Sequence, residues 1–416
     1  MSADRSPSPT GPTFPFQAVV LGAFVPSVLF GIAIGVVLPL LPLSATRLGG
    51  GLATAGVIAA LIPVGKIIAD LPAGALAARI GDRGAMLLAA GVGMVGLACV
   101  AVATELWLLG AGALVLGAAT AVFNLARHAY LTEITPADKR ARVLSTLGGM
   151  HRIGYFIGPF LGALVVAGAS IRPAYWLAAG CAALAAVAVL VVRDPAHLRT
   201  TRGDRPGPPV TLLGVMARHR RLFVTLGLTT FLVGAVRGAR QTVLPLWGEH
   251  LGLDPEVISL IFGLSGALDM LLFYPAGKVM DHFGRLWIGI PSMVVLAISM
   301  TLLPLAHTIP TLALVAALMG LGNGIGSGLI MTVGADVAPP GERAAFLGVW
   351  RLFQDTGDGA GPLVIAAGAA LGSLAAGIWV TAALGVGAAA ALARWVPRYS
   401  EHANRTTRLR AGLTAR

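Results

Sequence analysis

Charged side chains interrupt the long apolar segments of this 416-residue chain. A charge at the centre of a membrane-spanning helix costs about 2.5 to 3.5 kcal/mol on insertion scales, and residues of this kind typically mark substrate pathways or proton relays. Each one is therefore a candidate for function. The candidates are Lys66, Asp70, His151, Arg152, Arg237, Arg240, Asp269, Arg351, Asp355 and Asp358.

The elements that must position these charges are membrane-spanning helices. Hydrophobic residues make up 56% of the chain and charged residues 12%, and the mean hydropathy is +0.83, whereas a soluble domain carries roughly 25% charged residues. Because a spanning helix needs about 20 apolar residues, the sequence predicts an all-α membrane protein of twelve helices. The predicted helices are 18–43, 52–77, 85–104, 106–127, 143–168, 173–192, 222–247, 256–280, 286–306, 310–334, 345–370 and 374–393.

The net charge of +12 is distributed unevenly along the chain. Most of the 30 Lys and Arg residues lie in the N-terminus, the even-numbered connections and the C-terminal tail, and the odd-numbered connections hold only Arg47 and Arg172. This asymmetry follows the positive-inside rule. It predicts a multi-pass protein of the cytoplasmic (inner) membrane with both termini in the cytoplasm. The basic clusters then anchor the chain at anionic lipids, and no nucleic-acid partner is expected.

The chain repeats itself at a displacement of 203 residues. The repeated pairs are Pro72-Ala73-Gly74 with Pro275-Ala276-Gly277, Glu133 with Asp336, Arg140 with Arg343, and Gly154-x-x-x-Gly158-Pro159 with Gly357-x-x-x-Gly361-Pro362. A further run, Val37–Leu40, recurs as Val243–Leu246 at a displacement of 206 residues, which predicts a short insertion between the first two helices of one half. Two halves of six helices suit alternating access around a site near the bilayer midplane.

The repeat divides the chain into five predicted parts. These are a cytoplasmic N-terminal tail (1–17), a first six-helix bundle (18–193), a cytoplasmic linker (194–221), a second six-helix bundle (222–393) and a basic cytoplasmic tail (394–416).

The connections after the second and eighth helices carry a paired motif. They read Gly74-Ala-Leu-Ala-Ala78-Arg79-Ile-Gly81-Asp82-Arg83 and Gly277-Lys-Val-Met-Asp281-His282-Phe-Gly284-Arg285. Both resemble the Gly-x-x-x-Asp-Arg-x-Gly-Arg signature of the major facilitator superfamily, and the resemblance covers essentially the whole chain. It implies glycines that permit a tight turn and close helix contact, with charged residues that cap helix ends. Because Ala78 replaces the family's acid, no latch through that carboxylate is expected in the first half.

A second motif bears on the direction of transport. Gly154-x-x-x-Gly158-Pro159-Phe-Leu-Gly162 is similar to the core of the Gly-Pro motif of the family's twelve-span drug:proton antiporters, which implies export. The alternative is that these residues only let the fifth helix bend and pack closely. The same Gly-x-x-x-Gly-Pro pattern in the eleventh helix supports that alternative.

Four of the candidate charges lie at similar depth, roughly 14 to 17 Å from the cytoplasmic ends of their helices at 1.5 Å per residue. The repeat matches Lys66 to Asp269 and Arg152 to Asp355. In the fold that the resemblance implies, the second helix packs on the eleventh and the fifth on the eighth. We therefore predict two pseudo-symmetric ion pairs with swapped charges, and a third pair one turn nearer the cytoplasm. The predicted pairs are Lys66–Asp355 and Arg152–Asp269, and Asp70 and Arg351 could form the third.

Three interpretations of these pairs remain open. They fix how the two halves dock, or they act as gates that form and break, or one carboxylate carries a coupled proton, with Asp358 or Asp269 the better candidates. A neighbouring cation favours the charged carboxylate, so protonation would wait until the pair separates or substrate displaces the partner.

Polar residues of the first, fourth, seventh and tenth helices would line the substrate cavity, by the same resemblance. Arg237 and Arg240, whose first-half equivalents at the 206 displacement are Gly31 and Ile34, would favour a substrate with an anionic or acceptor-rich portion. The alternative is that these arginines bind backbone carbonyls. The remaining cavity candidates are Gln241, Asn124, Asn323 and His151, each of which could instead bond a neighbouring helix.

Other chemistry is not indicated. Cys99 and Cys181 lie in apolar segments, the eight His residues show no metal-ligand spacing, and no Walker motif is present. The glycine-rich run 320–328 lacks a preceding strand and is interpreted as helix packing. We expect no enzyme, metal or cofactor, with the proton gradient as driving force.

The function predicted is proton-coupled export of small amphipathic or partly anionic compounds by a monomer. Its partners are a small-molecule substrate, protons and the lipid bilayer. The alternatives are a proton symporter that takes up an anionic metabolite and, from another class, a membrane sensor without transport.

Overall fold

The computed structural model describes residues 16–166, 170–192, 212–339 and 341–412, and within these ranges it is almost wholly helical. Eleven described helical segments are long and apolar enough to cross a membrane. One more helix, α14 (Arg343–Ala370), has the length but is less apolar because it carries Arg351, Asp355 and Asp358. The predicted fold class is confirmed.

The helices form two halves. The N-half holds α1 (Phe16–Val19), the π-helical turn η1 (Val20–Phe24), α2 (Val25–Arg47), α3 (Leu52–Val102), α4 (Leu106–Ile134), α5 (Ala137–Val166) and α6 (Arg172–Val191). The C-half holds α7 (Leu212–Arg218), α8 (Arg220–Leu222), η3 (Phe223–Gly227), α9 (Leu228–His250), α10 (Pro255–Phe283), α11 (Leu286–Leu302), η4 (Leu303–Leu305), α12 (Ile309–Ile325), α13 (Leu329–Val337), α14, α15 (Leu374–Tyr399) and α16 (Arg405–Arg410). The predicted N-terminal tail and most of the linker lie outside the described residues.

The displacement of 203 residues holds throughout the two halves. It relates α2 to α9 and η1 to η3 at both ends, and it relates Gly49 to Gly252 and Gly81 to Gly284, all with positive φ. The predicted insertion after the first helix is therefore wrong. Pro42 corresponds to Pro245, and the match of Val37–Leu40 at 206 residues reflects the Leu- and Pro-rich composition of this helix.

The second and third spans meet within their predicted connection, whereas the tenth span differs from its predicted continuous form. Helix α3 contains two spans that meet at Gly81, whose φ of 78° breaks the helix and turns the chain. The tenth span is discontinuous, because α12 ends at Ile325 and α13 begins at Leu329 after Gly328 (φ 77°). The glycine-rich run thus breaks this span as well as packing it.

Glycines bring α2 and α5 into direct backbone contact. A Cβ built on Gly158 would lie 2.6 Å from the carbonyl oxygen of Ile32, and one on Gly31 would lie 2.7 Å from that of His151. The C-half repeats this contact between α9 and α14, where Gly234 and Gly238 lie against the backbone of α14. The Gly-Pro motif therefore serves close helix packing in both halves.

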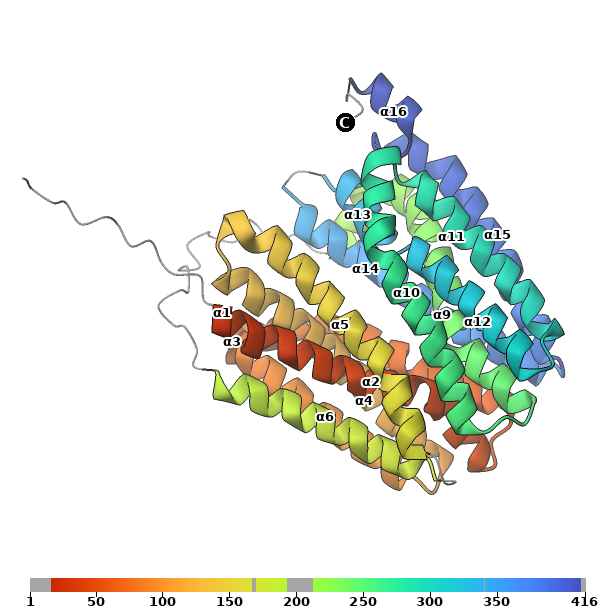
Figure 1. Cartoon of the computed structure of the whole chain (residues 1–416). Coiled ribbons are helices and arrows are strands. Elements are labelled where there is room, and N and C mark those ends of the chain that lie inside the picture. The colour runs from red at the N-terminus through yellow and green to blue at the C-terminus, as the bar shows by residue number, and fades with distance from the viewer. Residues whose placement is uncertain (1–15, 167–169, 193–211, 340, 413–416) are drawn as a thin grey trace, which may run out of the picture.

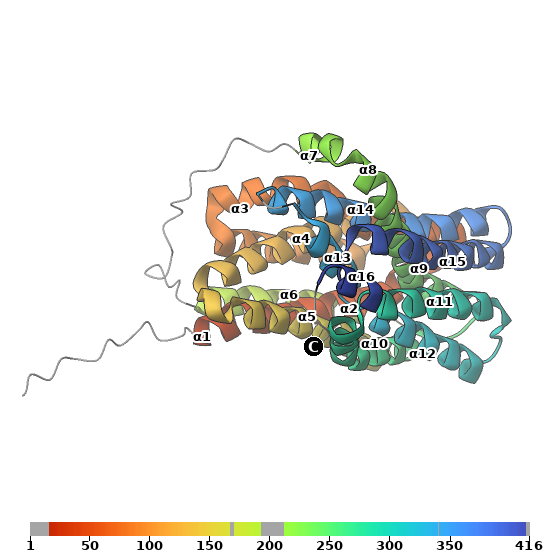
Figure 2. The same cartoon turned by 90° about the horizontal axis from the view of Figure 1, so that it is seen from above.

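The two halves lie side by side and contact each other mainly through α3 with α14 and α5 with α10 (Figures 1 and 2). We call the side with α1 and α16 the basic side and the other the opposite side. On the opposite side Thr46 donates a hydrogen bond to Glu249 at 2.8 Å, and Gly56 abuts Ala366. Toward the basic side the two bundles diverge (Figure 1).

Candidate functional site between the two halves

Lys66 and Asp355 form an ion pair between the halves. Lys66 Nζ lies 3.0 Å from Asp355 Oδ1, and the side chains are 21% and 4% exposed. Helix α3 supplies the cation and α14 the carboxylate, so the pair spans the interface in the predicted way. Arg351, one turn along α14 toward the basic side, is 40% exposed. The pair thus lies where the contact between the halves gives way to more open surroundings.

Asp269 is the centre of the second predicted pair and gathers more partners than expected. Arg152 Nη1 from the N-half approaches Asp269 Oδ1 at 3.4 Å, and Arg240 Nη2 approaches Oδ2 at 3.6 Å. Asn323 Nδ2 donates to the same carboxylate at 2.7 Å. One carboxylate therefore links α5 of the N-half to α9, α10 and α12 of the C-half.

The third predicted pair does not form. Arg351 lies 3.6 Å from Asp355 on its own helix, and Asp70 interacts through its side chain with Asp355 instead. The helical spacing of four residues lets Arg351 reach Asp355 without crossing the interface. The result is one cluster of two carboxylates and two cations.

Asp358 lines a small cavity at the interface together with Lys66, Tyr155 and Gln241. Its volume is about 90 Å³, below the roughly 300 to 1,000 Å³ of drug-sized ligand pockets. A substrate of that size needs the halves to move apart here.

Arg237 and Arg240 bind protein groups. Arg237 donates to the carbonyl oxygen of Gly326 at the break between α12 and α13, where helix carbonyls lack intrahelical partners. Arg240 donates to Ser265 Oγ at 3.0 Å in addition to its contact with Asp269. The alternative reading, carbonyl binding, therefore describes Arg237, and neither residue by itself argues for an anionic substrate.

Arg127 is a buried cation that the sequence analysis missed. It is 3% exposed, and its Nη1 lies 3.2 Å from Nδ1 of His151. The sequence placed Arg127 at the end of the fourth helix, but α4 continues to Ile134, which puts Arg127 roughly 10 Å inside the helix end. The apolar residues that follow Arg127 in the sequence could have indicated that the helix continues beyond it. Asn124, a predicted cavity residue, is buried one turn away on α4.

The signature turns are anchored differently in the two halves. In the C-half, Arg285 binds both carboxylate oxygens of Asp336 at 2.9 and 3.1 Å, whereas Asp281 is 79% exposed and 3.8 Å away. In the N-half, Arg83 donates to the carbonyl oxygens of Val189 and Leu190 near the end of α6. The expected turns occur at Gly81 and Gly284, but Gly74 and Gly277 face open space and make no close helix contact. Arg79 is exposed.

The described part of the basic C-terminal tail packs against the C-half signature turn. Helix α15 continues to Tyr399, beyond the predicted end at 393. Arg408 of α16 donates to the carbonyl oxygens of Asp281 and His282, and Ser400 donates to Asp336 at 3.1 Å. The tail therefore braces the C-half signature turn.

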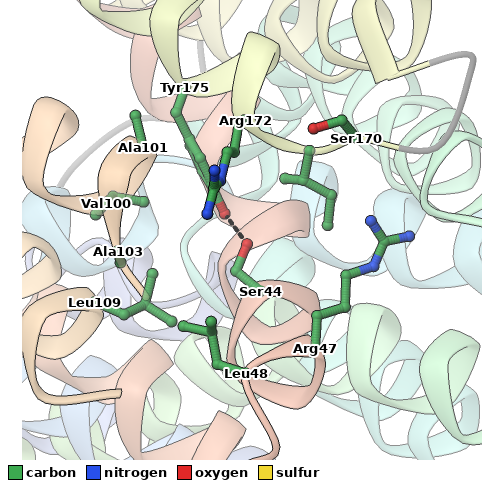
Figure 3. A pocket seen from close by; sticks show the side chains of 11 residues that line it. Ser44, Arg47, Leu48, Val100, Ala101, Ala103, Leu109, Ser170, Arg172 and Tyr175 are labelled. Atoms are coloured by element: carbon green, nitrogen blue, oxygen red, sulfur yellow. Dashed lines mark hydrogen bonds between the residues drawn. The ribbon is translucent and has the colours of Figure 1, made fainter. Parts of the chain in front are cut away.

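A further cavity, of about 190 Å³, lies within the N-half on the opposite side. Arg47, Arg172 and Leu109 are among its lining residues, and Tyr175 and Ser44 share a hydrogen bond of 2.6 Å there (Figure 3). All of its lining residues belong to α2–α6 or their connections, so it is separate from the interface. Within the described residues, no cluster of His, Cys, Asp or Glu could hold a metal ion.

Comparison with known proteins identifies the family. The Major Facilitator Superfamily profile matches residues 23–236 and 226–415. The uncharacterized MFS-type transporter YdeG of Bacillus subtilis is 28% identical over 72% of this chain and 73% of its own. The multidrug resistance protein MdtH of Edwardsiella ictaluri is 25% identical over 67% and 68%, and the quinolone resistance protein NorA of Staphylococcus aureus is 23% identical over 82% and 87%.

Solved structures share the fold. The nucleoside transporter NupG aligns with a TM-score of 0.72 at 15% identity, covering 91% of this chain and 99% of its own. A POT family transporter aligns with a TM-score of 0.74 at 13% identity, covering 92% and 96%. These neighbours carry different substrates, so the fold leaves the substrate of this chain open. Two complete six-helix halves and a family match over nearly the whole length show that the chain belongs to the Major Facilitator Superfamily of membrane transporters and is not an enzyme.

Proposed function

We propose that this transporter exports small amphipathic compounds in exchange for protons. The observation that carries the proposal is that Asp269 and Asp355 each pair with a cation of the other half at the interface. Alternating access requires the halves to rock against each other. Any movement that separates α3 from α14, or α5 from α10, takes a counter-charge away from a poorly exposed carboxylate.

Protonation offsets the cost of that separation. After separation Asp355 keeps only Arg351, and Asp269 keeps only Arg240, as a cationic partner. A carboxylate that loses one of two cations becomes easier to protonate. If the basic side faces the cytoplasm, as the positive-inside rule indicates, opening the opposite side would admit a proton from outside as substrate leaves. The relatives named for multidrug and quinolone resistance support export over import.

The test is transport by the purified chain in liposomes. A panel of amphipathic compounds is applied under a pH gradient, and substrate and proton fluxes are recorded together for wild type, Asp269→Asn and Asp355→Asn. We expect proton movement opposite to substrate movement in wild type, with at least a tenfold loss, about 1.4 kcal/mol in barrier terms, in one or both variants. Glu401→Gln is the matched control, because Glu401 is an exposed acid that follows α15 and belongs neither to the interface pairs nor to the signature turns.

Other results would replace the proposal. Proton and substrate movement in the same direction would indicate uptake by symport. Coupled flux that survives both substitutions would leave the pairs with a docking role only, and the absence of flux for every compound would favour a sensor.

A further inference from the structure

Among the described residues, Arg127 differs from the other cations near the interface in having neither a carboxylate nor a backbone carbonyl as its hydrogen-bond partner. Lys66, Arg152, Arg240 and Arg351 each lie within 4.0 Å of a carboxylate, and Arg237 binds the carbonyl at the end of α12. Among the described residues, the side chains recorded against Arg127 are the His151 ring and the Phe123 ring, whose centroid lies 6.0 Å away. His151 can accept the Arg127 donor only as a neutral ring.

The surroundings of Arg127 add unsatisfied polar atoms to this uncompensated charge. Arg127 Nε and Asn124 Oδ1 are both buried and lack a hydrogen-bond partner, and the two residues lie one turn apart on α4. A water molecule could satisfy a donor and an acceptor, but it cannot balance a buried charge. The site therefore offers a charged donor beside a neutral acceptor.

This site adjoins the interface between the halves. Tyr155 lies one turn from His151 on α5, with ring centroids 4.9 Å apart, and it also lines the interface cavity that holds Lys66 and Asp358. Arg127 therefore contacts His151, and Tyr155 connects His151 to the interface cavity.

We propose that Arg127 binds an oxyanion group, a carboxylate or phosphate, of an amphipathic ligand, and that Asn124 accepts a hydrogen bond from a neutral donor on the same molecule. This proposal rests on the proposed transport function and names its substrate class. It moves the anion-binding role from Arg237 and Arg240, which bind protein groups, to a residue of the opposite half. Charge-assisted hydrogen bonds are the stronger ones, so the oxyanion would supply much of the selectivity.

Binding to the purified full-length chain tests the proposal without a proton gradient. The probes are acid and ester pairs on one scaffold, namely 2-naphthoate with methyl 2-naphthoate and norfloxacin with its ethyl ester, together with 2-naphthyl phosphate and inorganic phosphate. Thermal stabilisation in one detergent gives an apparent affinity for each. We expect wild type to prefer the acids about tenfold or more over their esters and Arg127→Gln to lose that preference.

Two further variants keep the outcome interpretable. Arg127→Lys retains the charge and should keep part of the acid preference even if Arg127→Gln folds poorly. Arg394→Gln removes an exposed cation whose recorded contact is the Trp395 ring, and it should behave as wild type. Stabilisation by inorganic phosphate alone would show that the oxyanion binds without an apolar group. Stronger stabilisation by the naphthyl compounds would show that the apolar part also contributes to binding.

The proposal is overturned if wild type shows no acid preference for any pair, or if Arg127→Gln keeps the full preference. Because this experiment measures binding, it can reject the Arg127 proposal without rejecting proton-coupled export, and the reverse also holds. A chain could show the Arg127-dependent preference and no coupled flux, or coupled flux with no such preference.

Discussion

The carboxylates at the interface owe their placement to a pseudo-symmetric exchange of charge. The displacement that relates the halves turns Lys66 into Asp269 and Arg152 into Asp355, so the N-half presents two cations and the C-half two carboxylates. Each contact joins non-equivalent positions of the two halves, and because one half supplies both cations and the other both carboxylates, both contacts are attractive. The contacts fix the register of the halves and can also separate when the halves move.

Removing one partner of the Lys66–Asp355 pair should cost more than removing both. Asp355→Asn leaves the partly buried Lys66 without its closest carboxylate, and breaking a fully buried pair in this way costs about 3 to 5 kcal/mol, which is the upper bound here. A Lys66→Met/Asp355→Asn double variant removes both charges and should recover part of the loss, with a coupling energy of about 0.5 to 3 kcal/mol. Thermal unfolding of the four proteins measures this, and strictly additive effects would mean that the pair is not coupled.

Asp336 should matter far more to stability than Asp281, although Asp281 is the residue that fits the family signature. Asp336 receives two hydrogen bonds from Arg285 and one from Ser400, and its side chain is 12% exposed. Asp336→Asn should therefore lower the unfolding temperature clearly, since a poorly exposed pair is broken. Asp281→Asn alters an exposed contact and should cost about 1 kcal/mol or less. Equal shifts would contradict the brace assigned to Asp336.

Much of the site could be predicted from the sequence, because charged residues are rare inside apolar segments and therefore stand out as candidates. The Lys66–Asp355 and Arg152–Asp269 contacts follow from depth and the repeat together with the implied fold. Side-chain choices were not readable: Arg351 reaches Asp355 along its own helix, and Arg237 turns to a carbonyl that only the helix break exposes. Arg127 was missed because a helix end had to be placed without structure, and such ends shift by several residues.

At the scale of the helices, small residues decide how closely neighbours approach. The repeat and the signature turns predicted two bundles, and the structure supports them with backbone contacts at Gly158 and Gly238. The alignment of the two halves was wrong in the first helix, because short Leu- and Pro-rich runs match one another by chance. Positive-φ glycines such as Gly49 and Gly252 mark the register more reliably, since the backbone requires them.

Comparing Gly158→Ala with Gly162→Ala shows whether the motif needs glycine for direct backbone contact or only a small residue. A Cβ on Gly158 would meet the backbone of α2 at 2.6 to 2.7 Å, whereas one on Gly162 would meet Val36 and Leu40 at 3.6 Å or more. Gly158→Ala should therefore destabilise the protein by about 1 to 3 kcal/mol, as overpacking does, and Gly162→Ala should leave stability nearly unchanged. Thermal unfolding of both variants checks this, and a stable, fully active Gly158→Ala protein would refute the contact.

For the whole molecule, the contacts between halves are concentrated away from the basic side. Thr46 and Glu249 close the ends of α2 and α9 on the opposite side, and the two ion pairs lie deeper along the same interface. The structure therefore shows one conformation, in which the two bundles contact each other on the opposite side. Alternating access requires a second arrangement in which these opposite-side contacts are broken.

A cross-link between residues 46 and 249 should stop transport by blocking that second arrangement. Cys99 and Cys181 are first replaced by Ala, and Thr46→Cys is combined with Glu249→Cys, because their side chains are in hydrogen-bond contact at 2.8 Å. Oxidation should join α2 to α9 and reduce flux to background, and dithiothreitol should restore it. The single-cysteine variants control for loss of the hydrogen bond, since oxidation should leave their flux unchanged. If the joined protein still transports at the reduced protein's rate, the opposite side does not open between these two helix ends, and the movement inferred from the ion pairs would have to occur elsewhere in the interface.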